Sequence, residues 1–413
     1  AYLSRSIAEV EDVYYIYRVL GAKDCIDITY CYDMEQSYEC TNCFKCFNLK
    51  FSLNCKECSD SYFLYDCRSC KNCFMCWNLR NKEYCIFNKK YSKEEYEEKI
   101  KSLQLGSRKF LNQLKEKFKE HLKFDAYHRL DTNINNQNCS GNYITNCKNC
   151  QDVYFLEDSE DCRHVVRAPQ LKNCQDICGL YRGEMCYEIS QCNDNNNLWF
   201  SMFCLDTHNS QYCDQCLNCN DLFGCVSLKR KQYCILNKQY SKEDYVELRD
   251  KIIEKMKSDG EYGQMLPYKF SYNGYNLSLA MFYYSESEDS IKEKGGFFEK
   301  EPKRDVFGFD SELLPDESSE ITDDFVGKPI NCSKTNKTYN FIKKEIDFYR
   351  KHSLPLPDLY PEERNILRFK QMVPMNPEQT SCFKCSKDIV TYFPKDWGYE
   401  KILCEECYLK TVY

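Results

Sequence analysis

The chain has 413 residues, of which 31 are cysteine and 14 are glycine, and its formal net charge is −7. This acidic balance argues against a surface devoted entirely to nucleic acid, and the low glycine and proline content excludes collagen-like sequence. The cysteine content would suit a disulfide scaffold, but such scaffolds are usually shorter than about 80 residues. The cysteines of this longer chain therefore need another explanation. No apolar run approaches the roughly 18 residues of a membrane span, and no signal peptide is visible. We therefore expect a cytoplasmic protein with mostly reduced thiols.

The cysteines of residues 1–90 recur in a single phase of three. Every gap between successive cysteines from Cys25 to Cys85 is a multiple of three, and a longer step of twelve also appears. A short fixed period with small apolar residues in one phase is typical of a solenoid. We predict a Cys-rich array of twelve-residue β-coils that turn often, since a plain strand alternates with period two. The interleaved aromatic residues should form an outer sheath: Tyr62, Phe63, Tyr65, Phe74 and Trp77.

Residues 91–130 are predicted to form a helical cap and connector. Ser92 followed by Glu95 resembles a capping box, so we expect one helix over about 93–104 and a second over about 107–124. The second helix is amphipathic, with an apolar face of Phe110, Leu111, Leu114, Phe118 and Leu122 and a basic face of Arg108, Lys109, Lys115, Lys117, Lys119 and Lys123. The basic face is either simply solvated or a contact for nucleic acid or an acidic partner.

Residues 131–240 repeat the first array. The stretch 82–96 returns at 231–245 with an offset of 149. The same offset relates seven pairs of cysteines without a gap: Cys25 and Cys174, Cys43 and Cys192, Cys55 and Cys204, Cys67 and Cys216, Cys70 and Cys219, Cys76 and Cys225, Cys85 and Cys234. We predict a second Cys-rich array here, followed by a helix and an extended segment over 241–298.

Residues 299–329 are predicted to be an acidic linker. Residues 299–325 contain ten acidic and three basic side chains, whereas residues 326–413 contain fifteen basic and eleven acidic ones. Such a shift in composition is typical of a solvated connection between modules.

The C-terminal residues 330–413 are predicted to contain a degenerate and an intact zinc-ribbon module. Cys382-x2-Cys385 is followed after eighteen residues by Cys404-x2-Cys407, a spacing that fits one tetrahedral zinc ion with four thiolate ligands. The alternatives are reduced hairpins or two disulfides. A catalytic zinc keeps one position open, so this site should be structural. No HExxH, GxSxG, P-loop or GxGxxG pattern is present, and we expect no enzymatic activity.

Several segments spread over nearly the whole chain carry a family resemblance. They are 72–82, its copy 221–229, the two Tyr-Cys-Ile-x-Asn-Lys-x-Tyr-Ser-Lys-Glu stretches, 260–263, 275–276, 354–357 and 404–410. In these segments the chain resembles uncharacterised cysteine-rich, zinc-ribbon repeat proteins of small-genome candidate-phylum bacteria. Members sometimes carry a CoA-transferase label, which no residue pattern of this chain supports.

The resemblance implies two further expectations. Family members carry another zinc ribbon upstream, so the N-terminus of this chain should be truncated or processed. Family ribbons also pair a first CxxC with a later CPxCR, where this chain has Cys332-Ser333-Lys334-Thr335 and Tyr360-Pro361-Glu362-Glu363-Arg364. With three of four ligands missing, residues 330–370 should bind no zinc and should keep their shape by packing of Phe341, Ile342, Ile346, Phe348 and Tyr349.

The predicted fold is mainly β with helices: two tandem Cys-rich short-coil β-solenoid arrays, each ending in α-helices, and a C-terminal zinc-ribbon module. Solenoids present long surfaces, so we expect a zinc-binding repeat scaffold for macromolecular interaction or self-assembly. One alternative is a nucleic-acid- or ribosome-associated zinc-ribbon protein, whose binding would fall steeply with salt. The other is a thiol-based metal-storage or redox protein, which needs accessible cysteines of low pKa. In the array, buried thiols, bound metal at some positions and disulfides all remain open.

Overall fold

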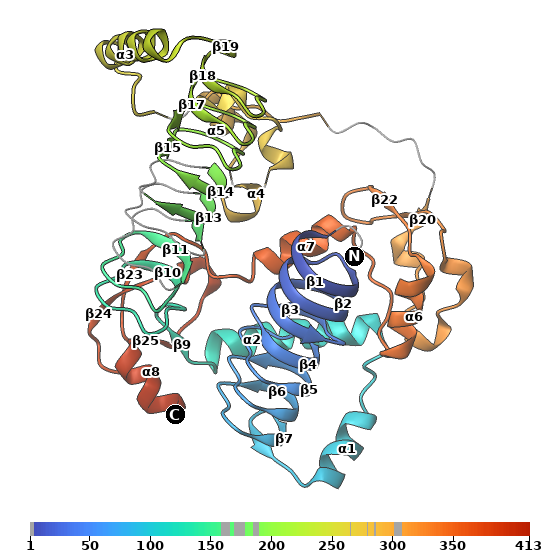
Figure 1. Ribbon diagram of the computed structural model, residues 1–413. Coiled ribbons are helices and arrows are strands. Elements are labelled where there is room, and N and C mark those ends of the chain that lie inside the picture. Colours follow the sequence, from blue (N-terminus) through green and yellow to red (C-terminus); the bar gives the residue numbers. More distant parts are fainter. Residues whose placement is uncertain are drawn as a thin grey trace. The chain divides into compact units, whose positions relative to one another are not determined.

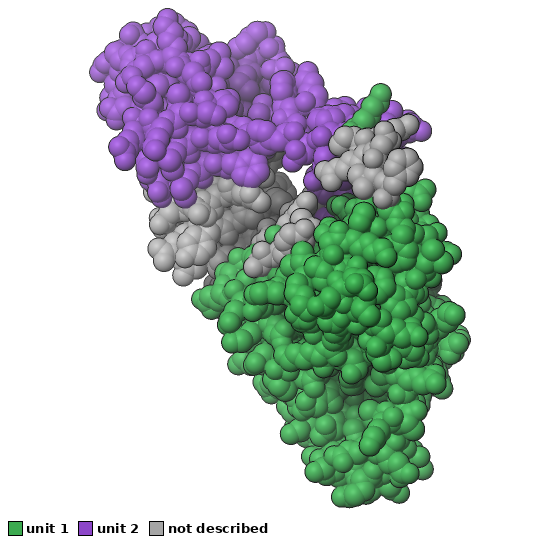
Figure 2. Space-filling model, turned by 90° about the vertical axis from the view of Figure 1, so that its right-hand side faces the viewer, with its two compact units in different colours: residues 1–130, 300–374, 378–413 green, residues 131–299, 375–377 purple. Residues whose placement is uncertain are grey.

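The protein is mainly β with flanking helices, and it divides into two compact units (Figures 1 and 2). Unit 1 comprises Ala1–Leu130, Lys300–Pro374 and Glu378–Tyr413, and unit 2 comprises Asp131–Glu299 and Met375–Pro377. The computed structural model describes residues 4–157, 166–168, 178–184, 190–264, 266–278, 280–284, 286–300 and 308–413. Within these residues no helix is both long and apolar enough to cross a membrane.

Unit 1 is built on a stack of parallel strands, here called the first stack (residues 5–90). Its strands are β1 (Arg5–Tyr14), β2 (Tyr17–Glu35), β3 (Tyr38–Thr41), β4 (Phe44–Lys50), β5 (Ser59–Tyr65), β6 (Lys71–Trp77), β7 (Glu83–Ile86) and β8 (Lys89–Lys90). Paired residues of the parallel strands are twelve apart, as in Ile28 with Cys40 and Cys73 with Cys85. The predicted twelve-residue step is confirmed, and an antiparallel β7–β8 hairpin ends the stack.

The period of three in the sequence has a backbone cause. From Asp24 to Phe87, every third residue has a positive φ, for example 52° at Asp24 and 57° at Asp27. Asn and Asp fill many of these positions, because their side chains tolerate the left-handed conformation. Each of the twelve cysteines from Cys25 to Cys85 directly follows such a residue and is buried. The chain therefore turns every three residues, as predicted, and each turn directs the next side chain inward.

Inward side chains also complete the hydrogen bonding of the backbone. The Ser52 hydroxyl accepts from the Leu64 N–H at 2.9 Å and donates to the Lys50 carbonyl at 2.9 Å. Cys76 does the same with longer bonds, accepting from the Asn88 N–H at 3.4 Å and donating to the Phe74 carbonyl at 3.3 Å. A small side chain with both a donor and an acceptor thus satisfies two buried backbone groups. This explains why the inward phase selects Cys and Ser.

Helices α1 (Lys93–Lys101) and α2 (Arg108–Phe124) follow the first stack. α1 begins at Ser92 with the predicted capping box. α2 lies along the side of the stack rather than over its end (Figure 1). The Phe118 ring meets Phe63 edge-on at 5.7 Å. The predicted apolar face is largely buried, with Leu111, Leu114, Phe118 and Leu122 inside and Phe110 partly exposed. Phe63, Tyr65 and Phe74 therefore form a second core between strands and helices.

Unit 1 also contains two C-terminal modules of similar build. The proximal module (residues 330–369) has a hairpin of β21 (Ile330–Asn331) and β22 (Thr338–Tyr339), then α6 (Lys343–Lys351) and α7 (Pro361–Phe369). The distal module (residues 378–412) has a hairpin of β23 (Glu378–Ser381) and β24 (Asp388–Thr391), then β25 (Ile402–Leu403) and α8 (Glu405–Val412).

The described part of the predicted linker is not simply solvated. Residues 301–307 lie outside the described residues. From Phe309 onward the segment forms β20 (Phe309–Asp310), which pairs with β21, and three short 3-10 turns. Leu314 and Ile321 are buried against the first stack and the proximal module. The acidic composition marks the exposed positions, while the apolar residues between them join the core of unit 1.

Unit 2 repeats the architecture of the first stack. Its parallel strands are β10 (Gly141–Thr145), β11 (Val153–Glu157), β12 (Val166–Ala168), β13 (Cys178–Glu184), β14 (Ser190–Asn196), β15 (Leu198–Trp199), β16 (Ser210–Gln211), β17 (Asn220–Phe223) and β18 (Gln232–Ile235). The register is again twelve, as in Leu222 with Cys234. A hairpin with β19 (Lys238–Gln239) and then α3 (Lys242–Ser258) end this stack. Cys174 lies outside the described residues, as does the side chain of Cys192.

The end of the second stack matches the end of the first at the offset of 149. β18, β19 and α3 begin at Gln232, Lys238 and Lys242, where β7, β8 and α1 begin at Glu83, Lys89 and Lys93. The Ser241 hydroxyl accepts from the Asp244 N–H at 3.1 Å, as Ser92 accepts from Glu95. The sequence duplication therefore continues as a duplication of structure through the first turn of the helix.

Candidate metal centre

The four predicted ligands meet in the distal module. The sulfur atoms of Cys382, Cys385, Cys404 and Cys407 all lie within 4.8 Å of one another, and those of Cys385 and Cys404 are 3.8 Å apart. A tetrahedral zinc with Zn–S bonds of about 2.3 Å requires sulfur separations of about 3.8 Å. The donor set and its spacing therefore fit one metal ion bound by four thiolates.

Backbone hydrogen bonds of the local fold bring these sulfur atoms together. Between β23 and β24 the chain makes a tight turn, in which the Cys382 N–H donates to the Lys387 carbonyl at 2.8 Å and the Ser386 N–H donates to the Cys382 carbonyl at 2.9 Å. Ser386 is left-handed, with φ of 59°. Cys404 sits at the N-terminal end of α8, and its N–H donates to the Cys382 sulfur at 3.3 Å. The hairpin and the helix start thus converge on one point.

The electrostatics of this cluster favour a cation. Burial opposes ionisation of the Cys382 thiol, but N–H groups of Cys385, Cys404 and Lys384 donate to it and lower its pKa to about 6. A hydrogen bond with Cys404 and the other neighbouring thiols raise the pKa of Cys407 to about 12. Four thiolates this close repel one another, so a divalent cation would offset that repulsion. With four protein ligands, a bound zinc ion would have no coordination position left for a catalytic water.

The proximal module repeats this turn without the ligands. The Cys332 N–H donates to the Lys337 carbonyl at 3.0 Å, and the Asn336 N–H donates to the Cys332 carbonyl at 2.9 Å. Asn336 is left-handed, with φ of 57°, like its counterpart in the distal turn. Tyr360 precedes α7 as Cys404 precedes α8. The two modules therefore share one backbone arrangement, a tight turn that faces the start of a helix.

Hydrogen bonds and apolar packing surround the one cysteine of the proximal turn. Burial opposes ionisation of Cys332, while hydrogen bonds from the Thr335 hydroxyl and the Tyr360 N–H lower the pKa of that thiol. Four of the five predicted core residues are buried, namely Phe341, Ile346, Phe348 and Tyr349, and Ile342 is partly exposed. The distal core is much smaller, with four buried residues, Cys382, Ile389, Leu403 and Tyr408.

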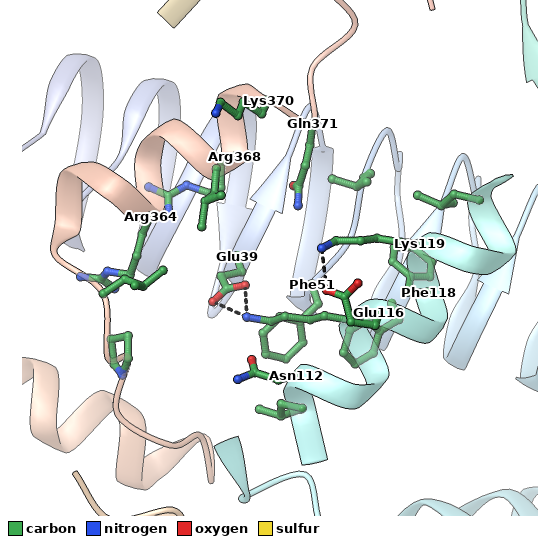
Figure 3. Close-up of a pocket in the computed structure, with 18 of the residues that line it drawn as sticks. Glu39, Phe51, Asn112, Glu116, Phe118, Lys119, Arg364, Arg368, Lys370 and Gln371 are labelled. Carbon is green, nitrogen blue, oxygen red and sulfur yellow. Dashed lines mark hydrogen bonds and ion pairs between the residues drawn. The ribbon is translucent and has the colours of Figure 1, made fainter. Parts of the chain in front are cut away.

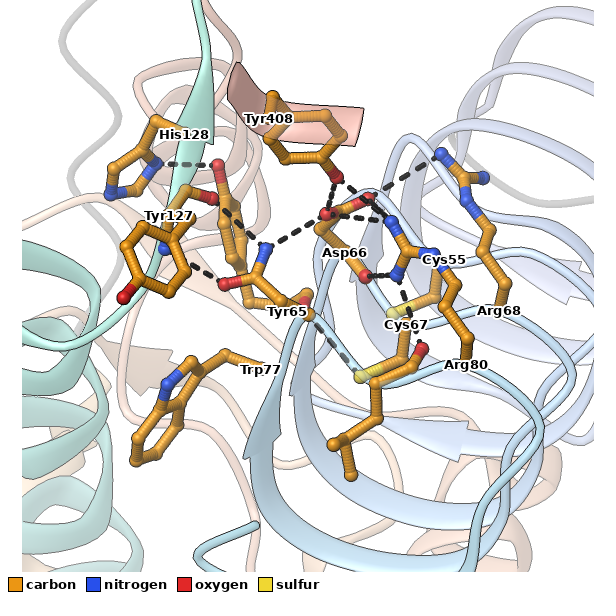
Figure 4. A network of polar contacts seen from close by, with 12 residues as sticks. Cys55, Tyr65, Asp66, Cys67, Arg68, Trp77, Arg80, Tyr127, His128 and Tyr408 are labelled. Carbon is orange, nitrogen blue, oxygen red and sulfur yellow. Dashed lines mark hydrogen bonds and ion pairs between the residues drawn. The ribbon is translucent and has the colours of Figure 1, made fainter. Parts of the chain in front are cut away.

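Helices α7 and α8 are each anchored to an aspartate of the first stack. On α8, the Tyr408 hydroxyl donates to Asp66, which also binds Arg80 at 3.1 Å, and Arg80 donates to the Tyr408 oxygen at 2.8 Å (Figure 4). On α7, Arg364 and Arg368 both bind the fully buried Asp27, with a distance of 2.8 Å from Arg368. Sequence reasoning missed both anchors, because no local pattern marks these residues.

A buried histidine links the distal module to the first stack and to α2. His128 lies in β9 (His128–Arg129), which pairs with β25. Its Nδ1 accepts from the Tyr65 hydroxyl at 2.7 Å (Figure 4). Its Nε2 donates to the Leu122 carbonyl at 2.7 Å, and its ring stacks on Tyr399 at 4.0 Å. Burial lowers the pKa of His128 to about 3, so the ring is neutral near neutral pH. His128 is therefore a packing and hydrogen-bonding residue of this interface.

The cations of α2 are distributed among several contacts. Lys115 pairs with Glu39 at 2.7 Å, and Lys119 with Glu116 at 2.7 Å. Arg108 donates to the Leu314 carbonyl at 3.1 Å, and Lys117 lies 4.7 Å from the centre of the Phe87 ring. Lys109 and Lys123 have no ion-pair partner among the described residues. Because several of these charges are already satisfied within unit 1, α2 is not a continuous basic stripe.

The thiols of the first stack do not gather into a second metal cluster among the described residues. Among the described residues, only the four cysteines of the distal module form a group of three or more cysteine, histidine or acidic side chains that could hold a metal ion. Burial raises the pKa of Cys25 and Cys40. Where thiols touch, hydrogen bonds between them lower the pKa of Cys70 and raise that of Cys58. Most stack thiols are therefore donors to carbonyl groups along a ladder.

No protein-family model matches the sequence, and no curated protein matches it significantly.

Proposed function

We propose that the protein is a non-enzymatic repeat scaffold, in which a C-terminal zinc ribbon is fixed by its metal against the side of a β-solenoid. In this proposal each stack is a solenoid of twelve-residue coils, and zinc is structural. One observation carries it: the four sulfurs cluster in a module with a small core, and the helix of that module is anchored on the first stack through Tyr408 and Asp66. In this proposal the metal stabilises the distal module and takes no part in a reaction.

Two features support interaction over thiol chemistry. The cysteines of the first stack are all buried, so they are shielded from reagents and metal ions in solvent. Unit 2, in contrast, exposes large aromatic side chains, with Tyr268 63% and Phe270 57% exposed. Aromatic residues are enriched at protein interfaces relative to other surfaces. A partner protein or a second copy of the chain is therefore the proposed occupant of these surfaces.

Native mass spectrometry of the purified chain tests this proposal, combined with thiol counting before and after denaturation. We expect one zinc ion per chain, with most thiols protected until the protein is unfolded. Size-exclusion chromatography with light scattering should then show self-association that is weakened by Tyr268→Ser with Phe270→Ser. Several bound metal ions, or stack thiols that react in the folded state, would instead favour a metal-storage or redox protein.

A further inference from the structure

Unit 1 contains a cavity that neither the metal centre nor the scaffold proposal uses. It has a volume of about 710 Å³ and lies between the side of the first stack, α2, the loop 355–359, the end of α7 and residues 396–399 (Figure 3). Small-molecule sites typically enclose about 300 to 1,000 Å³. The cavity therefore has the size of a site for a small organic ligand, and all of its walls belong to the same unit.

The floor of the cavity is aromatic. The rings of Phe51 and Phe63 stack at 4.8 Å with an interplanar angle of 16°. Phe118 of α2 meets Phe63 edge-on, and Trp397 and Tyr399 lie in the same lining. Phe51, Phe63 and Phe118 are buried, whereas Trp397 and Tyr399 are partly exposed, so these two rings offer the aromatic surface on which a planar ring would stack.

The walls carry an excess of positive charge in a chain whose net charge is −7. The lining has four carboxylates, Glu39, Glu116, Asp358 and Asp396, and seven cations, Arg108, Lys115, Lys119, Lys123, Arg364, Arg368 and Lys370. Asp27, outside the lining, binds two of these arginines. Even with Asp27 included, the count is seven positive against five negative groups, which leaves an excess of two.

The unbalanced cations are placed to receive an anion. Lys370 and Lys123 have no ion-pair partner among the described residues, and buried nitrogens of Arg108 and Arg364 lack a hydrogen-bond acceptor there. Figure 3 shows Lys370 and Gln371 directly after α7, and Lys119 on α2 in its pair with Glu116. The side-chain amides of Gln371 and Asn112 add donors and acceptors to the lining.

From these features we infer that the cavity binds a small organic anion with a planar ring, of the mononucleotide class. The ring would lie against Trp397, the phosphate groups would meet Lys123 and Lys370, and the amides would bind polar edges of the ring. Charge-assisted hydrogen bonds from lysine and arginine are the strong contacts to phosphate. The inference is independent of the scaffold proposal, since it uses neither the metal nor the solenoid surface.

Isothermal titration calorimetry of the full, zinc-loaded chain with ADP tests the inference. Saturable binding is expected, and Lys123→Glu with Lys370→Glu should weaken it by at least about a hundredfold, about tenfold for each reversed charge. Lys109→Glu is the matched control, because it reverses a charge on α2 outside the lining, and it should leave ADP affinity unchanged. No saturable binding of ADP, AMP or ATP would overturn the inference, as would equal weakening by the control variant.

Tryptophan fluorescence locates the ligand. The chain has three tryptophans, of which only Trp397 is in the lining. Trp77→Phe with Trp199→Phe therefore leaves one reporter at the cavity, and ADP should quench its emission with the affinity found by calorimetry. Binding without quenching would place the nucleotide elsewhere and overturn the inference. Binding of an acidic peptide but of no nucleotide would do the same, because charge alone would then explain the site.

Discussion

The proximal and distal modules of unit 1 solve one structural problem in two ways. Both have a tight hairpin turn facing the start of a helix, and both helices are anchored to an aspartate of the first stack. The proximal module retains one cysteine, Cys332, and has a large apolar core. The distal module has four clustered cysteines and a core of four buried residues. We therefore expect apolar packing to hold the proximal module together and a bound metal to hold the distal one.

The largest expected effect comes from removing the distal ligands. Cys385→Ser with Cys407→Ser should abolish metal binding and leave residues 378–412 without protection from hydrogen exchange, because structural zinc contributes on the order of 10 kcal/mol. The first stack should remain protected. Native mass spectrometry and hydrogen–deuterium exchange check both points. Cys332→Ala is the control in the proximal module and should retain the metal. Full protection of 378–412 without metal would contradict the comparison.

The next largest effect should come from the proximal anchor. Asp27→Asn leaves the buried Arg364 and Arg368 without their counter-charge, which typically costs about 3–5 kcal/mol. Urea denaturation should show this loss. Asp24→Asn is a matched control, because Asp24 is also left-handed but pairs with the half-exposed Lys351. Exposed pairs contribute about 1 kcal/mol or less. Equal effects of the two substitutions would show that the buried anchor is not special.

The distal interface should also be sensitive to acid through His128. Its pKa is about 3 in the folded protein and about 6.5 in the unfolded chain. Only the unfolded chain binds the proton between these values, so stability is full above about pH 6.5 and falls by up to about 1.4 kcal/mol per pH unit below it.

Comparison with the variant His128→Gln isolates the contribution of His128 to this pH dependence, because acid release of the metal affects both proteins. Between about pH 7.5 and about pH 5.5, the unfolding free energy of the wild-type chain should fall more steeply than that of the variant. Parallel pH profiles in urea denaturation would show that His128 is not neutral and buried in solution.

The smallest expected effect concerns the distal anchor. Tyr408→Phe removes the hydroxyl that donates to Asp66 while keeping the ring, which should cost about 1–2 kcal/mol. The metal should stay bound, because the four cysteines are unchanged. Tyr413→Phe is the control, since Tyr413 is 76% exposed and its ring contact with Arg80 is retained. A loss of metal in Tyr408→Phe would show that docking and metal binding form one cooperative unit.

Periodic and local signals were readable from the sequence. The phase of three and the step of twelve predicted the register that pairs Ile28 with Cys40, because each coil repeats the same environment for its inward residue. The capping box at Ser92 predicted the start of α1, since its contacts span only three residues. The spacing of the four cysteines predicted which sulfurs meet, because each CxxC turn sets two ligands locally.

Only the tertiary structure decided how the modules attach and where the chain is hollow. Asp27 meets Arg364 and Asp66 meets Tyr408 across separations of 337 and 342 residues, and no periodicity links those positions. The burial of Leu314 within an acidic segment and the cavity beside α2 likewise depend on distant elements coming together. The sequence alone determined the repeat, the duplication and the ligand set, since these arise from neighbouring residues. The anchors and the cavity required the fold, because they depend on long-range packing that single-chain patterns do not encode.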